Sequence, residues 1–168
     1  GFHPDLVWIK SRSGGENHNL FDVLRGTTKF LSSDTTTAQT TNTSSLQSFN
    51  SNGFTVGLAG TTGATQNYVS WNWKANGAGS SNTDGSITST VSANTTSGFS
   101  ISQWVGTGSN ATIGHGLGVT PKCFIVKKTS GTSAWSVYHE SVGNTKFLNL
   151  NGTGEPTTGS TVWNNTSP

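Results

Sequence analysis

The pattern of apolar and polar positions predicts short β-strands and almost no helix. Runs of β-branched and aromatic residues recur between segments rich in Gly, Asn, Ser and Thr, a pattern typical of strands joined by turns. The runs at 6–9 and 123–126 are continuously apolar, and we expect both faces of these strands to be covered. The run at 68–73 alternates instead, so it places on one face Val69, Trp71 and Trp73 and on the other Tyr68, Ser70 and Asn72.

Further segments fit the same picture. Residues 99–105, FSISQWV, predict another strand, and the Gly-containing segments at 52–54 and 84–85 predict turns. Only residues 17–26 could form an amphipathic helix, through Leu20, Phe21 and Leu24. The related segment 134–143 alternates better as a strand, and we therefore expect strands in both.

One phrase occurs twice along the chain. Residues 1–10 read GFHPDLVWIK and residues 118–127 read GVTPKCFIVK, an offset of 117 positions. At this offset, and without a gap, TKFL at 28–31 falls on TKFL at 145–148. A background rich in Ser and Thr does not produce this register by chance, and we interpret 1–51 and 118–168 as two copies of one segment.

The repeat predicts structure in three respects. We expect residues 1–46 and 118–163 to follow the same backbone trace. Pro4 and Pro121 should begin their strands rather than interrupt them, because proline cannot donate to a strand ladder. The chain would divide into a first, N-terminally incomplete unit at 1–76 and a second, C-terminally incomplete unit at 77–168, or form one combined sandwich.

Composition supports an all-β class. Only 10% of residues are charged and there are 22 glycines, yet six Trp and eight Phe are available for a core. The fold class that we predict is an antiparallel β-sandwich or jelly roll with an internal repeat. Cys123 lies in an apolar run and is expected to be a small buried side chain.

The charge pattern argues against two classes of partner. The net charge is +2, and no basic cluster is larger than Lys127-Lys128, whereas nucleic-acid binding needs a concentrated basic face. No apolar stretch is long enough to span a membrane. We therefore expect neither a nucleic-acid nor a membrane partner.

No catalytic, cofactor-binding or metal-binding motif is present. The four histidines have no metal-site spacing, nothing in the sequence favours a facing pair among the seven acidic residues, and no GxSxG nucleophile motif occurs. Glycine-rich stretches such as GTGSNA are not followed by a helix that would hold a phosphate. The sequence thus predicts a protein that is not an enzyme and that uses no cofactor.

The aromatic residues allow two interpretations. A sugar-binding surface presents aromatic faces flanked by polar side chains, and the candidate glycan contacts are Trp104, Trp135, Tyr138 and His139. The alternative is that these rings are core residues or cross-strand pairs, which is the commoner role. The exposure of Trp104, Trp135 and Trp163 distinguishes the two.

The combined phrases resemble a known kind of repeat. GFHPDLVWIKSRSG, FNSNGFTVG, YVSWNWKA and TIGHGLGVTPKCFIVKK are similar to a repeated domain of uncharacterised biochemistry in virion-associated and tail-fibre-like proteins of marine bacteriophages and prophages. The resemblance implies a structural or adhesive part of a virion, and it supplies no catalytic residues.

These observations lead to one functional hypothesis with one alternative. The hypothesis is a non-catalytic, self-associating structural module of a phage virion or extracellular fibre, whose partners are copies of itself or neighbouring repeats. The alternative is a carbohydrate-binding module that recognises cell-surface glycans. The candidate subunit interface lies at 147–168, where a strand from another chain would pair beside KFLNLN, and comprises Phe147, Leu148, Leu150, Val162 and Trp163. Equally open are completion by neighbouring repeats of a longer protein and closure as a monomer.

Overall fold

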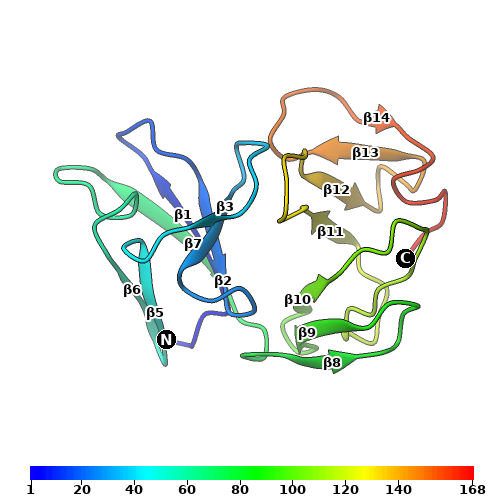
Figure 1. The fold of residues 1–168 in the computed structure, drawn as a ribbon, viewed down its shortest axis with the longest axis horizontal. Helices are drawn as coiled ribbons and strands as arrows, with labels where there is room; N and C mark the ends of the chain where they lie inside the picture. Colours follow the sequence, from blue (N-terminus) through cyan, green and yellow to red (C-terminus); the bar gives the residue numbers. More distant parts are fainter. The chain divides into compact units, whose positions relative to one another are not determined.

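The computed structural model describes residues 1–168 as an all-β chain without a helix (Figure 1). Its strands form antiparallel sheets in a β-sandwich-like arrangement, as the sequence predicted, although there are four sheets rather than two. The strands are β1 (Leu6–Ser11), β2 (Asn19–Asp22), β3 (Lys29–Ser32), β4 (Thr40–Thr41), β5 (Leu46–Asn50), β6 (Gly53–Val56), β7 (Tyr68–Trp73), β8 (Ser80–Asn82), β9 (Ser89–Asn94), β10 (Phe99–Trp104), β11 (Cys123–Val126), β12 (Ser136–His139), β13 (Lys146–Asn149) and β14 (Thr157–Thr158).

The chain forms two compact units. The first comprises residues 1–30 and 40–118, and the second comprises residues 31–39 and 119–168. The repeat boundary expected after residue 76 falls inside the first unit. The compact units and the sequence repeats are therefore different divisions of the chain.

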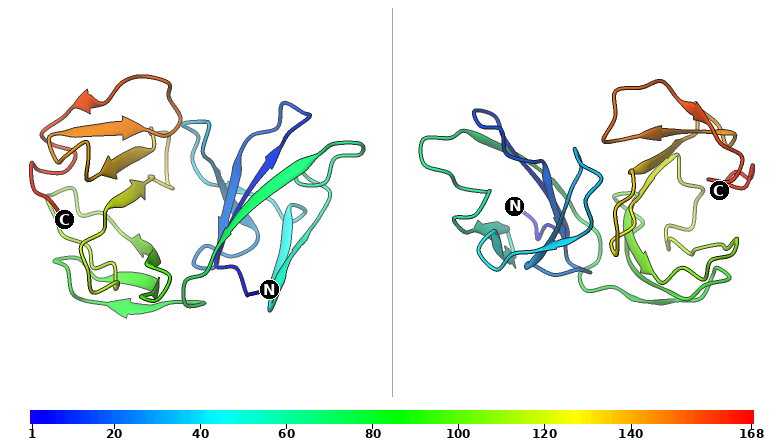
Figure 2. Two further views of the ribbon diagram at one scale, coloured as in Figure 1. Left: turned by 180° about the vertical axis from the view of Figure 1, so that it is seen from behind. Right: turned by 45° about the horizontal axis from the view of Figure 1, so that its top comes forward.

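The core of the first unit lies between a large sheet and a hairpin. The sheet has the order β4-β3-β2-β1-β7, and β5 and β6 form the hairpin (Figure 2). The chain turns between them at the predicted segment 52–54. The buried side chains at the centre are Val7, Ile9, Phe21 and Leu46, with Phe49, Phe54 and Val56 of the hairpin packed against them.

The second unit repeats the first four strands of this sheet. Its sheet has the order β11-β12-β13-β14, and its strands begin 117 residues after those of β1 to β4. The register also repeats: Val7 lies opposite Phe21 in the first copy, and Phe124 lies opposite Tyr138 in the second. This agreement in strand order and register confirms the common trace expected for the repeated segments.

The side chains that pack against the two repeated sheets also come from corresponding positions. In the second unit, Trp163 lies edge-on against Phe124 and Tyr138, with ring centroids 4.9 and 6.0 Å away. Position 163 corresponds to Leu46, which packs on Val7 and Phe21 in the first unit. A larger side chain therefore takes the place of Leu46 in the second copy.

Several local expectations are confirmed. The segments 17–26 and 134–143 contain the strands β2 and β12 and no helix, and the strand expected at 99–105 is β10. Pro4 and Pro121 each lie two residues before a strand, as a residue without a backbone N–H should.

The burial of two strands differs from expectation. We expected aromatic strands to fill the core, but β7 directs Tyr68 toward the core and leaves Trp71 on the outer face, 48% exposed. We expected both faces of β11 to be covered, but Cys123 is exposed and Ile125 is 45% exposed. In the first copy, β7 lies beside β1 and shields the corresponding face, whereas β11 has no such neighbour in its sheet.

Candidate functional site

The outer face of the first sheet carries a row of aromatic rings. Trp8 of β1 lies between Trp71 and Trp73 of β7, with ring centroids 5.7 and 6.4 Å away, and Trp73 stacks on Phe99 at 6.1 Å. The antiparallel register pairs Trp8 with Trp71 and thereby brings the rings together. We call Trp8, Trp71, Trp73 and Phe99 the aromatic row.

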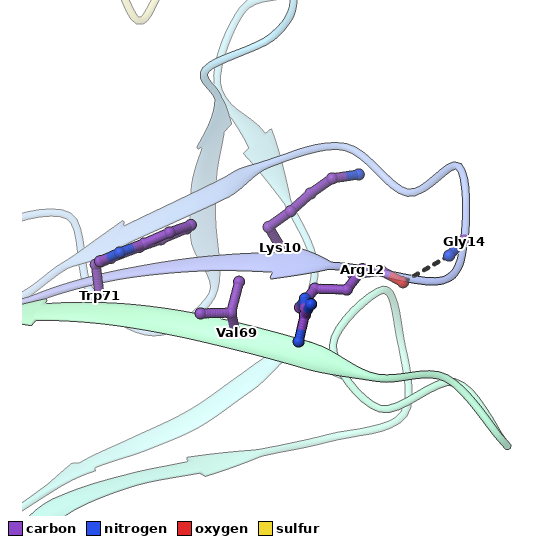
Figure 3. A pocket seen from close by; sticks show the side chains of 6 residues that line it. Lys10, Arg12, Gly14, Val69 and Trp71 are labelled. Carbon is purple, nitrogen blue, oxygen red and sulfur yellow. Dashed lines mark hydrogen bonds between the residues drawn. The ribbon is translucent and has the colours of Figure 1, made fainter.

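An open hollow of about 520 Å³ lies beside the aromatic row, on β1, the loop that follows it and β7 (Figure 3). The lining includes the ring of Trp71, the apolar side chain of Val69, and the cationic Lys10 and Arg12. Lys10 Nζ donates a hydrogen bond of 2.8 Å to the backbone oxygen of Glu16. An exposed ring beside two cations can bind a flat apolar face next to an anionic group.

The residues predicted to contact glycans do not form one surface. Trp135 and Tyr138 are only 4% and 5% exposed and belong to the core of the second unit, which corrects their assignment as a ligand platform. His139 is exposed on the opposite face of β12, where its Nδ1 accepts a hydrogen bond from Ser141 N–H. Trp104 is 37% exposed at the end of β10. The more exposed Trp ring is that of Trp71, at 48%. The alternation of 68–73 placed it on one face with Val69 and Trp73 without indicating whether that face is outside.

The residues predicted to form a subunit interface already pack within their own unit. Phe147, Leu148, Leu150, Val162 and Trp163 are all half-buried. Phe147 and Leu148 belong to β13, which lies between β12 and β14. We expected an open edge beside KFLNLN, but both sides of this strand are occupied. Whether another chain covers the exposed surface of residues 147–168 stays a prediction.

The open edge of the repeated sheet is β11. It is the last strand on one side of its sheet, and β12 occupies its other side. Comparison of the repeated segments alone could not reveal this edge, because the strand that covers β1 is β7, which lies outside them.

Two ionisable groups near this edge have shifted pKa values. Although Cys123 is exposed, partial desolvation raises the pKa of its thiol. Burial and the neighbouring charge of Lys128 lower the pKa of Lys127. Lys127 Nζ also donates to the backbone oxygen of Lys128 at 3.0 Å and that of Thr36 at 3.3 Å. The thiol is thus held in its protonated form to a higher pH than usual.

Groupings typical of other site classes are absent. No group of three or more His, Cys, Asp or Glu residues is close enough to hold a metal ion. There is also no helix with the length and apolar character needed to cross a bilayer.

The fold and these surfaces define a class of protein: an all-β protein built on an internal repeat, with the edge of β11 and an aromatic face exposed. Residues 1–168 match the family described as a domain of unknown function, DUF7483, and the chain belongs to this family. No curated protein and no solved structure matches the chain.

Proposed function

We propose that the chain is a non-catalytic structural module of a phage virion or extracellular fibre, which assembles with like units through its sheets. Its partners are copies of itself or neighbouring repeats of a longer protein. The observation that carries the proposal is the second four-stranded sheet, which matches the first in register but lacks a fifth strand beside β11. An open sheet edge is a template for pairing with another chain.

Composition and resemblance support this role. A surface rich in Ser, Thr, Asn and Gly with few charges is suited to a part whose task is shape rather than catalysis. The phrases that resemble repeats of tail-fibre-like proteins extend along nearly the whole chain, and repeats in a row assemble through contacts with their neighbours.

Self-association can be tested by sedimentation velocity over about three orders of magnitude in protein concentration. We expect the sedimentation coefficient to rise with concentration, and electron microscopy to show rings or filaments, the products of a head-to-tail contact. Because few charges are present, added salt should change the association little. A chain that stays monomeric over the whole range would contradict self-association.

The hollow beside Trp71 favours a second candidate function, carbohydrate binding. Trp71 offers an exposed ring face, and Lys10 and Arg12 would favour a sugar that carries carboxylate or sulfate groups. We expect Trp71→Ala to abolish binding to an acidic polysaccharide measured by calorimetry, and Arg12→Gln to weaken it. Trp104→Ala, which removes an exposed ring elsewhere, is the control and should have no effect. Failure of the native chain to bind, or unchanged binding by Trp71→Ala, would exclude this site.

A further inference from the structure

The edge of β1 shows how the edge of β11 can be occupied. In the first copy, β7 pairs antiparallel with β1 over its whole length, so that Leu6 lies opposite Trp73 and Ser11 opposite Tyr68. The residue that corresponds to Leu6 in the second copy is Cys123, at the beginning of β11. β1 pairs with β2 in the same register as β11 with β12, so the side of β1 that binds β7 and the open side of β11 present the same backbone pattern.

The backbone groups at the open edge can be identified. Glu140 N–H donates to the backbone oxygen of Lys122 at 2.8 Å, which makes residues 122 and 140 a hydrogen-bonded pair. Bonded and non-bonded pairs alternate along antiparallel strands. Phe124 and Val126 therefore bond to β12, while the N–H and C=O groups of Cys123 and Ile125 face the open side.

The side chains at this edge also lack a neighbour. Ile125 corresponds to Trp8, which is half-buried between Trp71 and Trp73 of β7. A strand with the β7 pattern beside β11 would place a Trp ring against Ile125 and another against Cys123. It would cover the exposed apolar surface and pair the free backbone groups in the same step.

We infer that the open edge of β11 binds an extended segment with the sequence of β7, supplied by a further repeat unit of this family, in the register that β7 uses on β1. This inference rests on the proposed structural function and specifies the contact with a neighbouring repeat. Each chain has one β7 but two strands, β1 and β11, that can accept it. A β7 that left its own sheet would vacate one edge to fill another, so the donor is a segment not already paired with a β1.

The charges of the residues that flank the two strands provide a test of the proposed register. Lys74 directly follows β7, one position beyond the Leu6–Trp73 pair with which the ladder between β1 and β7 ends. The second copy has Lys122 where the first has Asp5. In the proposed register Lys74 of the donor would lie near Lys122, and like charges close together on neighbouring strands weaken a strand pair. A donor with Lys74→Glu should therefore bind more tightly than the native segment.

The test uses a synthetic peptide of residues 66–76, added to the full chain. We expect saturable binding in fluorescence anisotropy, with affinity about tenfold lower for a peptide of the same composition in scrambled order. The Lys74→Glu peptide should bind more tightly than the native one. Binding of the native and scrambled peptides with equal affinity would overturn the inference.

Cross-linking locates the peptide on the chain, because Cys123 is the only cysteine of the chain. Paired residues on adjacent strands have Cα atoms about 5.5 Å apart, within the range of a disulfide. A peptide with Trp73→Cys, supplied as its mixed disulfide with thiopyridine, should therefore exchange with the Cys123 thiol, forming the peptide–Cys123 disulfide and releasing thiopyridine. A peptide with Asn72→Cys presents its thiol on the opposite face and should not. Equal cross-linking of both peptides, or of neither, would overturn the register.

A variant of the chain tests the backbone contact. Ile125→Pro removes an N–H that faces the open side and is not used by β12, so the sheet should remain folded while peptide affinity falls about tenfold. Ile125→Thr keeps the N–H and is the matched control, for which we expect a much smaller loss. Circular dichroism verifies that both variants fold. If Ile125→Pro does not fold, the cross-linking yield of the Trp73→Cys peptide with the native chain serves as the second measurement.

The outcomes separate the inference from the function on which it rests. If no peptide binds while the chain still self-associates, the lysines that flank β11 protect its edge, as edge lysines do in other sheets. The inference then fails and the structural function stands. If the peptide binds and cross-links while the chain stays monomeric, the acceptor edge stands and self-association of identical chains fails.

Discussion

At the scale of single residues, Asp5 explains why β7 can remain beside β1. Its carboxylate is only 2% exposed and accepts hydrogen bonds from Ala75 N–H at 2.6 Å and Gly77 N–H at 3.2 Å. These contacts hold the chain where it leaves β7. The second copy has Lys122 at this position, exposed and paired with Glu140 at 3.0 Å. The buried Asp5 carboxylate is thus present in the copy whose sheet has a fifth strand, and absent from the copy whose sheet lacks one.

We predict that Asp5→Ala destabilises the first unit by about 2–4 kcal/mol, because it leaves two partly or fully buried N–H groups without an acceptor. Urea unfolding followed by tryptophan fluorescence measures the loss. Asp5→Asn retains an amide oxygen as acceptor and should lose about half as much. A loss below about 1 kcal/mol in Asp5→Ala would show that water replaces the carboxylate.

Cys123 gives a prediction for pH dependence. Only the thiolate reacts with iodoacetamide, and burial raises the thiol pKa, so the midpoint of the rate–pH profile should lie above that of the same chain in denaturant. The folded chain holds this proton more tightly than the unfolded chain. The free energy of unfolding should therefore fall as pH rises above the ordinary thiol pKa and level off above the raised value. Coincident profiles for folded and denatured chain would contradict the shift.

At the scale of elements, most strands could be predicted because their apolar residues are local and periodic. The run at 68–73 was recognised to the residue as β7, and the repeat resolved the ambiguity between helix and strand at 17–26. Face assignment was harder. Alternation shows which residues of β7 share a side, but the hairpin of β5 and β6 decides which side is buried.

The segment 31–39 could not be predicted to join the second unit. Trp135 Nε1–H donates to the backbone oxygens of Ser32 at 3.0 Å and Thr35 at 3.1 Å, and Gln39 N–H donates to Thr129 O at 2.9 Å. These partners are about a hundred residues apart along the chain, and nothing in the local pattern of either segment indicates the other. For the same reason, the burial of Trp135 was not evident from sequence.

We predict that Trp135→Phe destabilises the second unit by about 2–4 kcal/mol, because it removes the shared donor and leaves a partly filled site. Hydrogen exchange should accelerate at the Gln39 amide, whose bond to Thr129 depends on the same segment. Trp104→Phe, at a more exposed site, is the control and should change stability by less than about 0.5 kcal/mol. Unchanged exchange at Gln39 would mean that Trp135 does not anchor this segment.

At the scale of the whole molecule, the repeat was the most informative feature of the sequence. Its offset predicted a common backbone trace for residues 1–46 and 118–163, and the structure shows this trace in the matching order and register of β1 to β4 and β11 to β14. It did not identify the open edge, because β7 and the hairpin come from the segment that occurs once. The pairing of β7 with β1 is a long-range contact, and only the structure reveals it.

The repeat also predicts how the second sheet can be completed within one chain. Pro168 corresponds to Ser51, so a copy of residues 52–76 appended after Pro168 continues the sequence in phase and supplies counterparts of β6 and β7. We expect the appended β7 copy to pair with β11, to slow the reaction of Cys123 with iodoacetamide, and to protect the Cys123 and Ile125 amides from hydrogen exchange.

The extra strand should raise the melting temperature of the second unit by about 5–10 °C, which corresponds to roughly 2–3 kcal/mol for a chain of this size. The matched control carries the same appended residues in scrambled order, so that composition and length are unchanged. Pairing in phase requires that only the native order protect Cys123 and Ile125. If the scrambled segment gives the same protection, or if neither segment gives any, then β11 does not recognise the β7 sequence, and the correspondence between the two copies ends at their fourth strand.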